Sequence, residues 1–513
     1  MSALYRSTSI RDCESRELDR LPPLTLMDRA AGALADTCTH VLRGMPSRTP
    51  VIALVGPGNN GGDALLAALK LRDRGFDAQA LALNDQAPLA PDARAVFMRS
   101  QSLQFPRLPE LSSHLLGRTL FIDGLFGVGL SRAIEGRSAG WIHALNAAGA
   151  RVVAADLPSG IDADTGAIVG GPRACAMVAH CTVTFLADKP GLRTGAGRAH
   201  AGQVRVAPLG VEVTTPAGTL VTQAEASALA TSLARRSDSH KGIHGHVAVV
   251  GGGKGMQGAA VLAALGAQRA GAGKVSVGSP NGWRLDPGAH PQLMTLPDNW
   301  SPESFQAVVI GCGLGITKRT VDTLKSVLRR TASPIVLDAD ALNLIAAEPA
   351  LAALLMQRVA PAVLTPHPLE AARLLRCATA DIQSDRIRAA TTLAARTGSV
   401  VVLKGAGTVC ADAAGHWAVI DSGSPALATA GTGDVLAGVI GGLLAQGLPP
   451  SSAAVLGAWV HGRAGEIAAA QQRGDIGLST AELPARVRDT LNQLVNTSIA
   501  HARSDHTGQD LDQ

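Results

Sequence analysis

Short apolar runs that end in Gly, Asp or Pro recur through both halves of the chain, separated by Ala/Leu-rich stretches with a helical pattern. In the first half they are VIALVG, TLFIDGLFG, RVVAADLPSG and CTVTFLA, which begin at residues 51, 119, 151 and 181. In the second half they begin at residues 246, 274, 307, 334, 362 and 400. Nearly continuous Val/Ile/Leu strands are typical of parallel sheets that helices cover on both faces. We therefore predict an α/β fold in which each half forms its own three-layer αβα sandwich.

The length of the chain also requires more than one domain. At 513 residues it is too long for one ordinary hydrophobic core. The boundary is expected near residues 212–225, because this stretch contains no strong strand run. We predict a first domain over residues 1–215, a second domain over 225–498, and a polar tail over 499–513.

Composition excludes several classes of protein. Hydrophobic residues make up 46% of the chain and charged residues 17%, which is ordinary for a globular protein. Aromatic residues make up only 3%, so a nucleic-acid site built on base stacking is not expected. The formal charge of +5 forms no basic block.

Cysteine usage and the absence of an apolar leader favour the cytoplasm. None of the seven cysteines forms a C-x-x-C pair, so the spacing indicates neither a zinc site nor a disulfide framework. The N-terminus lacks an apolar signal core, and the most membrane-like window, VLAGVIGGLLAQG, is too short to cross a bilayer. We expect a cytoplasmic protein with neither nucleic acid nor membrane as a partner.

The loop GPGNNGGD at residues 56–63 follows the first strand and opens a helix. Free backbone N–H groups and the positive helix end attract anions at such a position, and glycine lets a ligand approach the backbone closely. The loop has neither the P-loop lysine nor the G-x-G-x-x-G spacing. The alternative is a tight turn in which Asp63 only caps the helix.

Two further strand ends carry acidic residues. Asp123 precedes a Gly-rich loop, and Asp156 precedes Pro158-Ser159-Gly160. Ligands of open α/β sheets bind beyond the carboxyl ends of the strands, where all three segments meet. Oxygen atoms of Asn60, Asp123 and Ser159 could surround a hard cation. Asp156 alone would more often be a structural cap than an acid/base group, but its neighbours favour the second role.

These segments, together with TVTFLADKPGL, resemble the NAD(P)H-hydrate epimerase domain, which is Rossmann-like. The resemblance implies K+ bound by Asn60, Asp123 and Ser159, proton transfer by Asp156, and a role for Lys189. It implies that the hydrated dinucleotide contacts Asn59, Asn60, Gly61, Gly62, Asp63, Gly127, Val128, Gly129, Leu130, Ser131, Arg132, Ala133 and Asp156. One departure is Ala64, where the family usually has Gly, and little effect is expected from it.

In the second half, the segment ALATAGTGDVLAGVIGGLL is the strongest signal. Gly431-Thr432-Gly433-Asp434 opens an apolar helix, so its N–H groups can stabilise an anion beside one carboxylate. Asp434 could accept the proton of a hydroxyl that attacks phosphorus. The turn from Lys404 to Thr408 ends a strand and can meet phosphate with charge, N–H and hydroxyl groups.

Simpler interpretations remain open at this stage. Asp434 could only complement the helix dipole, which is worth about 0.3–1 kcal/mol. His367 in VLTPHPLE could be a solvated or hydrogen-bonded residue rather than a ligand-binding one. Asp338 and Asp340 in VLDADALNL could position Mg2+ or cap the following helix.

These motifs, with HKGIHGHVAVVGG and GCGLG, cover most of residues 239–438. They are similar to the ribokinase-like ADP/ATP-dependent NAD(P)H-hydrate dehydratase. The resemblance implies Mg2+ and an adenine nucleotide held by Lys404, Gly405, Ala406, Gly407, Thr408 and Gly433. It implies hydrate contacts from Ala260, Gly313, His367 and Asp434. Two residues depart from the family: Cys312, where Pro is usual and which should loosen a turn, and Gln292, where Glu is usual.

The two resemblances in this order imply a bifunctional repair enzyme for NADH and NADPH hydrated at C6 of the nicotinamide ring. The first half would interconvert the R and S hydrates, and the second would dehydrate the S form with ADP or ATP, with ADP favoured. A homo-oligomer is also expected. The alternatives are a vitamin or sugar kinase with a fused Rossmann-like binding domain, and a non-catalytic binding protein.

Overall fold

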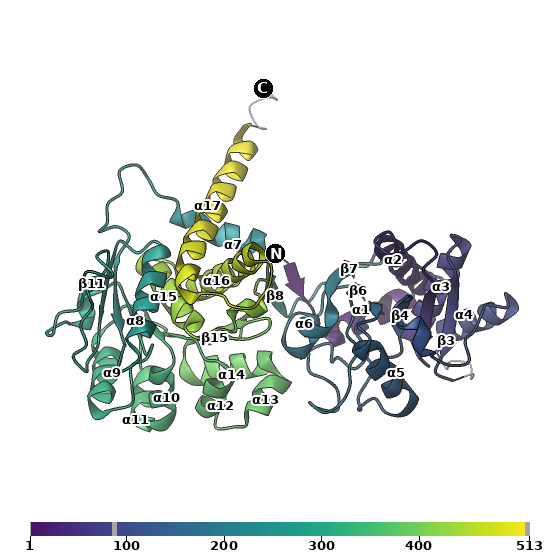
Figure 1. The fold of residues 1–513 in the computed structure, drawn as a ribbon, viewed down its shortest axis with the longest axis horizontal. Helices are drawn as coiled ribbons and strands as arrows, with labels where there is room; N and C mark the ends of the chain where they lie inside the picture. The colour runs from purple at the N-terminus through teal and green to yellow at the C-terminus, as the bar shows by residue number, and fades with distance from the viewer. Residues whose placement is uncertain (1, 85–89, 508–513) are drawn as a thin grey trace. The chain divides into compact units, whose positions relative to one another are not determined.

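The computed structural model describes residues 2–84 and 90–507. It divides into two compact units, one of Ala3–Gly218 and one that starts at Thr219 and also includes Ser2. Figure 1 colours the first unit from purple to teal and the second from teal to yellow. The division falls inside the stretch where the sequence places the boundary.

The first unit is built on a six-stranded sheet in the order β3-β2-β4-β5-β6-β7, and every neighbouring pair is parallel. Its strands are β2 (Val51–Val55), β3 (Ala78–Ala82), β4 (Leu120–Gly124), β5 (Arg151–Ala155), β6 (Cys181–Phe185) and β7 (Gln203–Ala207). Its helices are α1 (Ser7–Leu18), α2 (Thr25–Leu42), α3 (Asn59–Asp73), α4 (Pro91–Ser102), α5 (Gly136–Ala147) and α6 (Gly195–Ala201).

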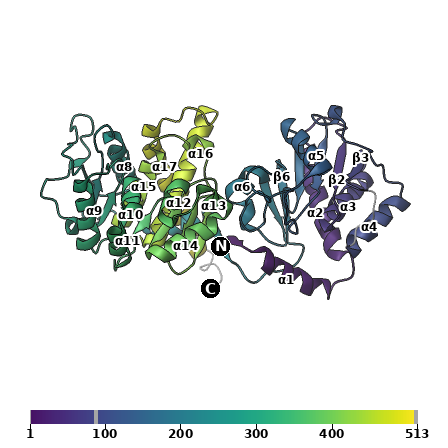
Figure 2. The ribbon, with the colours of Figure 1, turned by 90° about the horizontal axis from the view of Figure 1, so that it is seen from below.

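Helices cover both faces of this sheet because successive side chains of each strand point to opposite faces. In β2, Val51, Ala53 and Val55 belong to the core that includes α2 and α3. Ile52 and Leu54 belong to the core on the other face, with α5. Figure 2 shows α5 on one side of β2 and β6, and α2 and α3 on the other. The predicted three-layer sandwich is confirmed for this unit.

The second unit is built on an eleven-stranded sheet in the order β1-β8-β17-β16-β15-β14-β13-β12-β9-β10-β11. All pairs from β8 to β11 are parallel except those of β16, which runs antiparallel to β15 and β17. The strands are β1 (Ser2–Leu4), β8 (Gly218–Val221), β9 (His246–Val250), β10 (Lys274–Gly278), β11 (Met294–Thr295), β12 (Ala307–Ile310), β13 (Ile335–Leu337), β14 (Val363–Leu364), β15 (Val400–Leu403), β16 (Val409–Ala411) and β17 (Trp417–Ile420).

Two groups of helices pack on opposite faces of this sheet (Figure 1). One group contains α7 (Gln223–Ala230), α8 (Gln257–Arg269), α15 (Thr432–Ala445), α16 (Pro450–Gln472) and α17 (Leu483–Thr507). The other contains α9 (Lys318–Arg330), α10 (Asp340–Ala347), α11 (Pro349–Met356), α12 (Pro368–Leu375), α13 (Thr379–Ser384) and α14 (Arg386–Thr397). The second unit is therefore also an αβα sandwich.

The Gly-rich sequence of α15 is explained by its close packing on α8. A Cβ atom at Gly438 would lie 1.9 Å from the carbonyl oxygen of Ala263. A Cβ at Gly442 would lie 2.5 Å from that of Ala267. Because no side chain fits between the backbones, the apolar window that contains these glycines forms a buried helix pair. Among the described residues, the structure contains no helix with the length and apolarity needed to span a bilayer.

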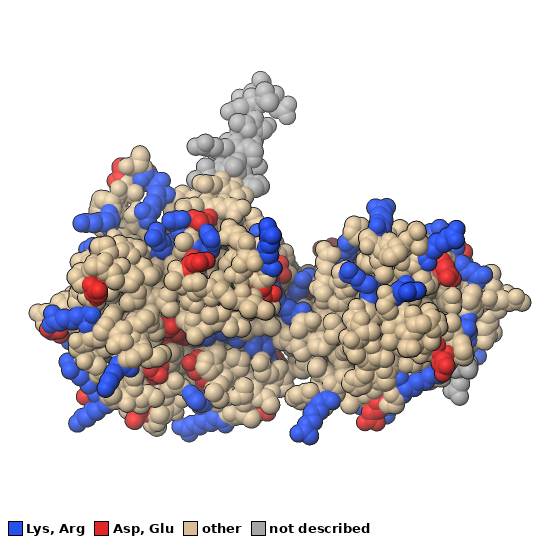
Figure 3. Space-filling model, in the orientation of Figure 1, with Lys and Arg blue, Asp and Glu red and all other residues tan. Residues whose placement is uncertain are grey.

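Two features differ from the sequence prediction. The boundary stretch contains the strand β8, which pairs in parallel with β17, although no strong strand run is visible there. Helix α17 continues through Thr507, so the first part of the stretch predicted as a tail, 499–507, is helical, and residues 508–513 lie outside the described residues. On the face drawn in Figure 3, Lys/Arg and Asp/Glu side chains are intermingled over each unit.

Candidate functional site

In the first unit, three predicted cation ligands gather beside the carbonyl group of Phe126. Ser159 Oγ donates a hydrogen bond of 2.6 Å to Asp123 Oδ1, and the Ser159 backbone N–H donates one of 2.8 Å to Oδ2. Ser159 Oγ also lies 3.2 Å from the Phe126 oxygen, to which Asn60 Nδ2 donates at 3.2 Å. Burial raises the pKa of Asp123 to about 6, although the bonds from Ser159 and Leu125 lower it. Carboxylate, hydroxyl, amide and carbonyl oxygens suit a hard monovalent cation such as K+.

Asp156 follows β5 and is held in one orientation. Its φ of 61° lies in the left-handed region, where a non-glycine residue is strained, and such strain is typical of functional sites. Its Oδ1 accepts hydrogen bonds from Lys189 Nζ at 2.6 Å, the Phe185 backbone N–H at 3.0 Å and Thr184 Oγ1 at 3.2 Å. Lys189 is 1% exposed. Within the described residues no hydrogen bond is formed by Oδ2, so this oxygen is available to a ligand.

Asp156 lines a cavity of about 540 Å3, a size typical of small-molecule and cofactor sites. The predicted contact residues that line it are Asn59, Asn60, Asp63, Gly127, Val128, Gly129, Leu130, Ser131, Arg132 and Asp156. Gly61, Gly62 and Ala133 are not among its lining residues. A Cβ at Gly61 would lie 2.1 Å from the carbonyl oxygen of Gly56, so Gly61 is required by the tight turn into α3.

Acidic groups are concentrated around this cavity. Burial raises the pKa of Asp63 well above its usual range, and the nearby Asp156 and Glu14 raise it further. Burial and Asp156 likewise raise the pKa of Glu14, although Lys189 lowers it. The interpretation of Asp63 as a helix cap is wrong, because the N-cap of α3 is Gly58 and no side chain caps it.

Helix α1 supplies a wall of the cavity that sequence reasoning missed. Ser7, Ile10, Arg11 and Glu14 line it. The i, i+3, i+4 and i+7 spacing of these residues places them along one face of a helix, and this is the signal that could have indicated them. A second cavity of about 240 Å3 shares Glu14 with the first and has a mainly apolar lining.

In the second unit, the site is centred on an ion pair between the partly exposed Lys404 and the buried Asp338. Asp338 lies at the end of β13 and is 2% exposed. Its Oδ1 accepts hydrogen bonds from Lys404 Nζ at 2.8 Å and Thr365 Oγ1 at 2.6 Å. Burial alone would lower the pKa of Lys404, but the carboxylates of Asp338 and Glu370 raise it. Lys404 is therefore charged and fixed at the edge of the sheet.

Asp434 lies in the first turn of α15, which begins after Gly431 at a φ of 88°. Burial and the neighbouring Asp338 raise the pKa of Asp434 to about 6, while Cys312 and Lys404 lower it. A carboxylate with such a pKa is ionised at neutral pH and is a better general base than an ordinary aspartate. The structure thus places Asp434 near Lys404, Asp338 and Cys312.

The turn after β15 has a conformation that depends on glycine. Gly405 and Gly407 have φ values of 144° and 60°. Arg386, which is 1% exposed, donates bonds of 3.1 Å to the carbonyl oxygens of Leu403 and Lys404 and so fixes the end of the strand. Burial lowers the pKa of Arg386 to about 10. No sequence motif indicated this residue, because it comes from α14.

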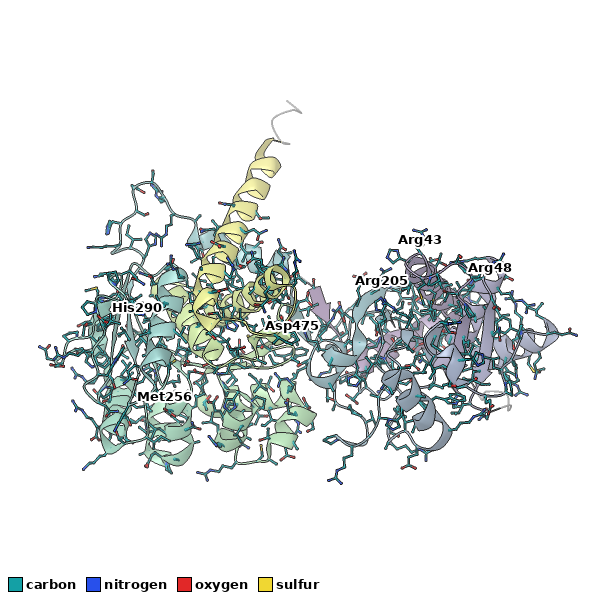
Figure 4. The ribbon with its side chains drawn as sticks, viewed as in Figure 1. Arg43, Arg48, Arg205, Met256, His290 and Asp475 are labelled. Carbon is teal, nitrogen blue, oxygen red and sulfur yellow. The ribbon has the colours of Figure 1, made fainter. Side chains whose placement is uncertain are left out.

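The other predicted contacts lie near the first turns of two helices. Ala260 is buried in α8, and Gly313 has a φ of 57°. A Cβ at Gly313 would lie 2.7 Å from the Cβ of Met256, which directly precedes α8 and is labelled in Figure 4. The loop that contains Gly313 approaches Met256, at the start of α8, so closely that position 313 requires glycine.

His367 is the N-cap of α12. Its Nδ1 accepts bonds from the backbone N–H groups of Leu369 at 3.1 Å and Glu370 at 3.3 Å, and its ring is about half exposed. His367 is therefore a hydrogen-bonded residue through its Nδ1. Its contact with the hydrated dinucleotide stays a prediction. Asp340 accepts a bond of 2.8 Å from the Gly315 N–H, and no side chain caps α10, so the capping alternative for Asp338 and Asp340 is wrong.

Comparison with known protein families covers both units. The family model described as NAD(P)H-hydrate dehydratase matches residues 247–485, and that of the YjeF-related protein N-terminus matches residues 23–191. A bifunctional NAD(P)H-hydrate repair enzyme of Moorella thermoacetica is 36% identical over 92% of this chain and 94% of its own. The chain belongs to this family of bifunctional repair enzymes.

Other relatives agree over nearly the full length. The bifunctional NAD(P)H-hydrate repair enzyme of Coxiella burnetii is 35% identical over 96% of this chain and 100% of its own, and that of Escherichia coli is 36% identical over 94% and 91%. Among solved structures, an ADP/ATP-dependent NAD(P)H-hydrate dehydratase of Bacillus subtilis, co-crystallised with ATP/Mg2+, has a TM-score of 0.48 and 30% identity. It covers 54% of this chain and 99% of its own.

Proposed function

We propose that the two units carry out successive steps in the repair of hydrated NADH and NADPH. The first unit epimerises the R and S hydrates, and the second dehydrates the S hydrate to the reduced cofactor. The observation that carries this proposal is shared by both units: at the carboxyl edge of each parallel sheet, the proposed acid/base carboxylate lies near a lysine, Asp156 beside Lys189 and Asp434 near Lys404.

In the first unit, Asp156 is the proton-transfer group. Hydration makes C6 of the nicotinamide ring a stereocentre next to a ring nitrogen, and acid/base assistance at the C6 hydroxyl allows its configuration to change. Lys189, Thr184 and the Phe185 N–H hold Oδ1 of Asp156, so Oδ2 is the oxygen presented to substrate. The 540 Å3 cavity and the N–H groups at the start of α3 suit the pyrophosphate-bearing substrate.

The oxygen cluster of Asn60, Asp123 and Ser159 would hold K+. Its donors are all hard oxygen ligands, and the buried Asp123 supplies the negative charge. A bound K+ would supply positive charge close to the substrate. Arg11, Arg132 and Lys189 are the cationic side chains that line the cavity in the described part of this unit.

In the second unit, Asp434 is the general base. Hydroxide is a poor leaving group, so the C6 hydroxyl is first phosphorylated: Asp434 takes its proton, an O–P bond forms, and a P–O bond of the nucleotide breaks. Phosphate then leaves with a proton from the adjacent carbon, which restores the ring double bond. The N–H groups of Gly431, Thr432 and Gly433 would stabilise charge on the transferring phosphoryl group.

The turn of Lys404–Thr408 with Gly433 would hold the nucleotide, and ADP is the proposed donor. Mg2+ usually keeps several waters and binds through one or two carboxylates and the phosphates of the nucleotide. Asp340 and Asp434 are the carboxylates of this site that fit that requirement. Asp338 accepts hydrogen bonds from Lys404 and Thr365 through its Oδ1.

Asp434→Asn tests the second step. Supplied with S hydrate and ADP, the variant should recover NADH absorbance at least about 100-fold more slowly than the wild type, because a general base contributes 10²–10⁴-fold. Asp322→Asn, on the exposed surface of α9, is the matched control. Wild-type recovery by Asp434→Asn would remove this residue from the mechanism. Release of a stable phosphorylated product instead of inorganic phosphate would favour a small-molecule kinase.

Asp156→Asn tests the first step with a mixture of both hydrates and ADP. We expect the S half to be repaired at the wild-type rate and the R half to follow only at the spontaneous rate of epimerisation. The exposed Asp73→Asn, at the end of α3, should repair both halves like the wild type. Repair of the R half by Asp156→Asn above the spontaneous rate would refute the assigned role.

The proposed setting is the cytoplasm. All seven cysteines are free thiols, and six of them are buried, which suits a reducing compartment. Cell fractionation tests this location, and light scattering on the purified protein tests whether it is a homo-oligomer.

A further inference from the structure

A thiol and two carboxylates meet at the carboxyl edge of the second sheet. Cys312 follows β12, Asp338 follows β13, and Asp434 lies in the first turn of α15. One ligand atom of each lies within 4.8 Å of the other two, and Cys312 Sγ is 3.8 Å from Asp338 Oδ2. In a tetrahedral zinc site, sulfur and oxygen ligands lie roughly 3.5 Å apart, given Zn–S of about 2.3 Å and Zn–O of about 2.0 Å. The cluster is close to that spacing.

The orientation of Asp338 leaves the correct oxygen for a metal ion. Lys404 Nζ and Thr365 Oγ1 both donate to Oδ1, so Oδ2 is the oxygen turned to the thiol of Cys312. Partners that hold the second oxygen of a ligand in this way orient it and are typical of metal sites.

The charges of the cluster also favour a cation. Cys312 and Asp338 are 0% and 2% exposed, and two carboxylates close together in a largely buried place are costly without enough compensating positive charge. Lys404 supplies one positive charge, and a divalent cation would offset the rest. Asp434 is only partly buried, so the cluster is reached from its side.

We propose that Cys312, Asp338 and Asp434 form a binding site for a thiophilic divalent cation, with Zn2+ as the reference ion, and that the bound ion blocks dehydration by occupying the carboxylate of Asp434. Mg2+ prefers oxygen ligands, whereas a thiolate selects zinc-like ions. The thiol loses its proton to solvent when the metal–sulfur bond forms. The blocking step rests on the proposed role of Asp434, but metal binding does not.

The full-length protein with Co2+ as a spectroscopic substitute for Zn2+ tests the site. We expect a thiolate-to-cobalt charge-transfer band at one ion per chain, which Zn2+ abolishes by displacement. Cys312→Ser keeps the size of the side chain but removes the sulfur, so the band should disappear. Cys377→Ala removes the exposed thiol, the most accessible rival ligand, and should keep the band. Circular dichroism checks that both variants are folded.

Activity provides the second measurement. Zn2+ should inhibit dehydration by the wild type and Cys377→Ala at concentrations at least about tenfold lower than for Cys312→Ser, since loss of even an outer-shell partner of a metal ligand costs about 10–100-fold in affinity. The inference would be overturned if the wild type showed no charge-transfer band or if the band survived in Cys312→Ser. It would also be overturned if Zn2+ inhibited the wild type and Cys312→Ser at equal concentrations. If the band behaves as expected but Asp434→Asn dehydrates normally, the metal site stands and the proposed role of Asp434 falls.

Discussion

The second unit should lose stability at mildly acidic pH because of one buried histidine. His461 lies in α16 and is 8% exposed. Its Nε2 is 2.8 Å from the carbonyl oxygen of Thr432, the first residue of α15, so the neutral ring donates this bond. Burial lowers the pKa of His461 to about 4, although the bond to Thr432 raises it.

The sign of the effect follows from proton linkage. Below pH 6.5 the histidine of the unfolded chain takes up a proton that the folded protein does not take up until about pH 4. Stability is therefore fully present above pH 6.5 and is lost as the pH falls from 6.5 to about 4. At 1.36 kcal/mol for each pH unit, the total is about 3 kcal/mol, and most of it is lost by about pH 4.5.

Urea unfolding at about pH 7.5 and about pH 4.5, followed by tryptophan fluorescence, measures this loss. Four of the five tryptophans, at positions 283, 300, 417 and 459, report on the second unit. In His461→Gln the amide can donate to Thr432 but does not titrate, so its loss between the two pH values should be smaller by about 2–3 kcal/mol. Other groups titrate equally in both proteins and cancel in this comparison. An equal pH dependence of the two proteins would refute the reasoning.

Three further predictions concern the first unit, each measured as a change in the free energy of unfolding in urea. Lys189→Met leaves the carboxylate of Asp156 without its buried partner and should lower the free energy of unfolding by about 3–5 kcal/mol. A decrease below about 1 kcal/mol would show that the pair is not buried in solution. Gly61→Ala places a methyl group 2.1 Å from a carbonyl oxygen and should cost about 1–3 kcal/mol, so an unchanged midpoint would contradict the tight turn. Ser159→Ala removes a hydrogen-bond donor to the buried carboxylate of Asp123 and should lower the free energy of unfolding by about 1.5–3 kcal/mol. Added K+ should stabilise this variant less than the wild type. Equal stabilisation of both proteins would exclude this hydroxyl as a K+ ligand.

The sheet strands and the loops that follow them could be predicted because their signals are local. Each of the ten apolar runs forms a strand, and the glycines at 56, 61 and 431 lie in the predicted turns. The strands that sequence reasoning missed, such as β3 and β8, lack a continuous Val/Ile/Leu run. Strand β8 is stabilised by pairing with β17, about 200 residues later in the chain, and no local pattern contains that information.

The candidate site was predictable only where its residues lie in a motif. Lys404 and Asp434 each stand next to a glycine at a strand or helix end, and Asp156 follows a strand four residues before Gly160, so the sequence marks them. Arg386 and Glu14 come from helix faces far away in the sequence, and their roles depend on burial against another element. A long-range contact of this kind becomes visible only when the fold brings the two elements together.

The lysines of the two units pair with carboxylates that have different proposed roles. In the first unit, Lys189 pairs at 2.6 Å with Asp156, the proposed proton-transfer group itself. In the second, Lys404 pairs at 2.8 Å with Asp338, and the proposed base, Asp434, has a pKa of about 6 because it is buried near that second carboxylate. Asp338 therefore acts through Asp434: it holds Lys404 in place, and its negative charge makes Asp434 more basic. Because Cys312 lies close to both carboxylates, its thiol occupies a position able to change this balance.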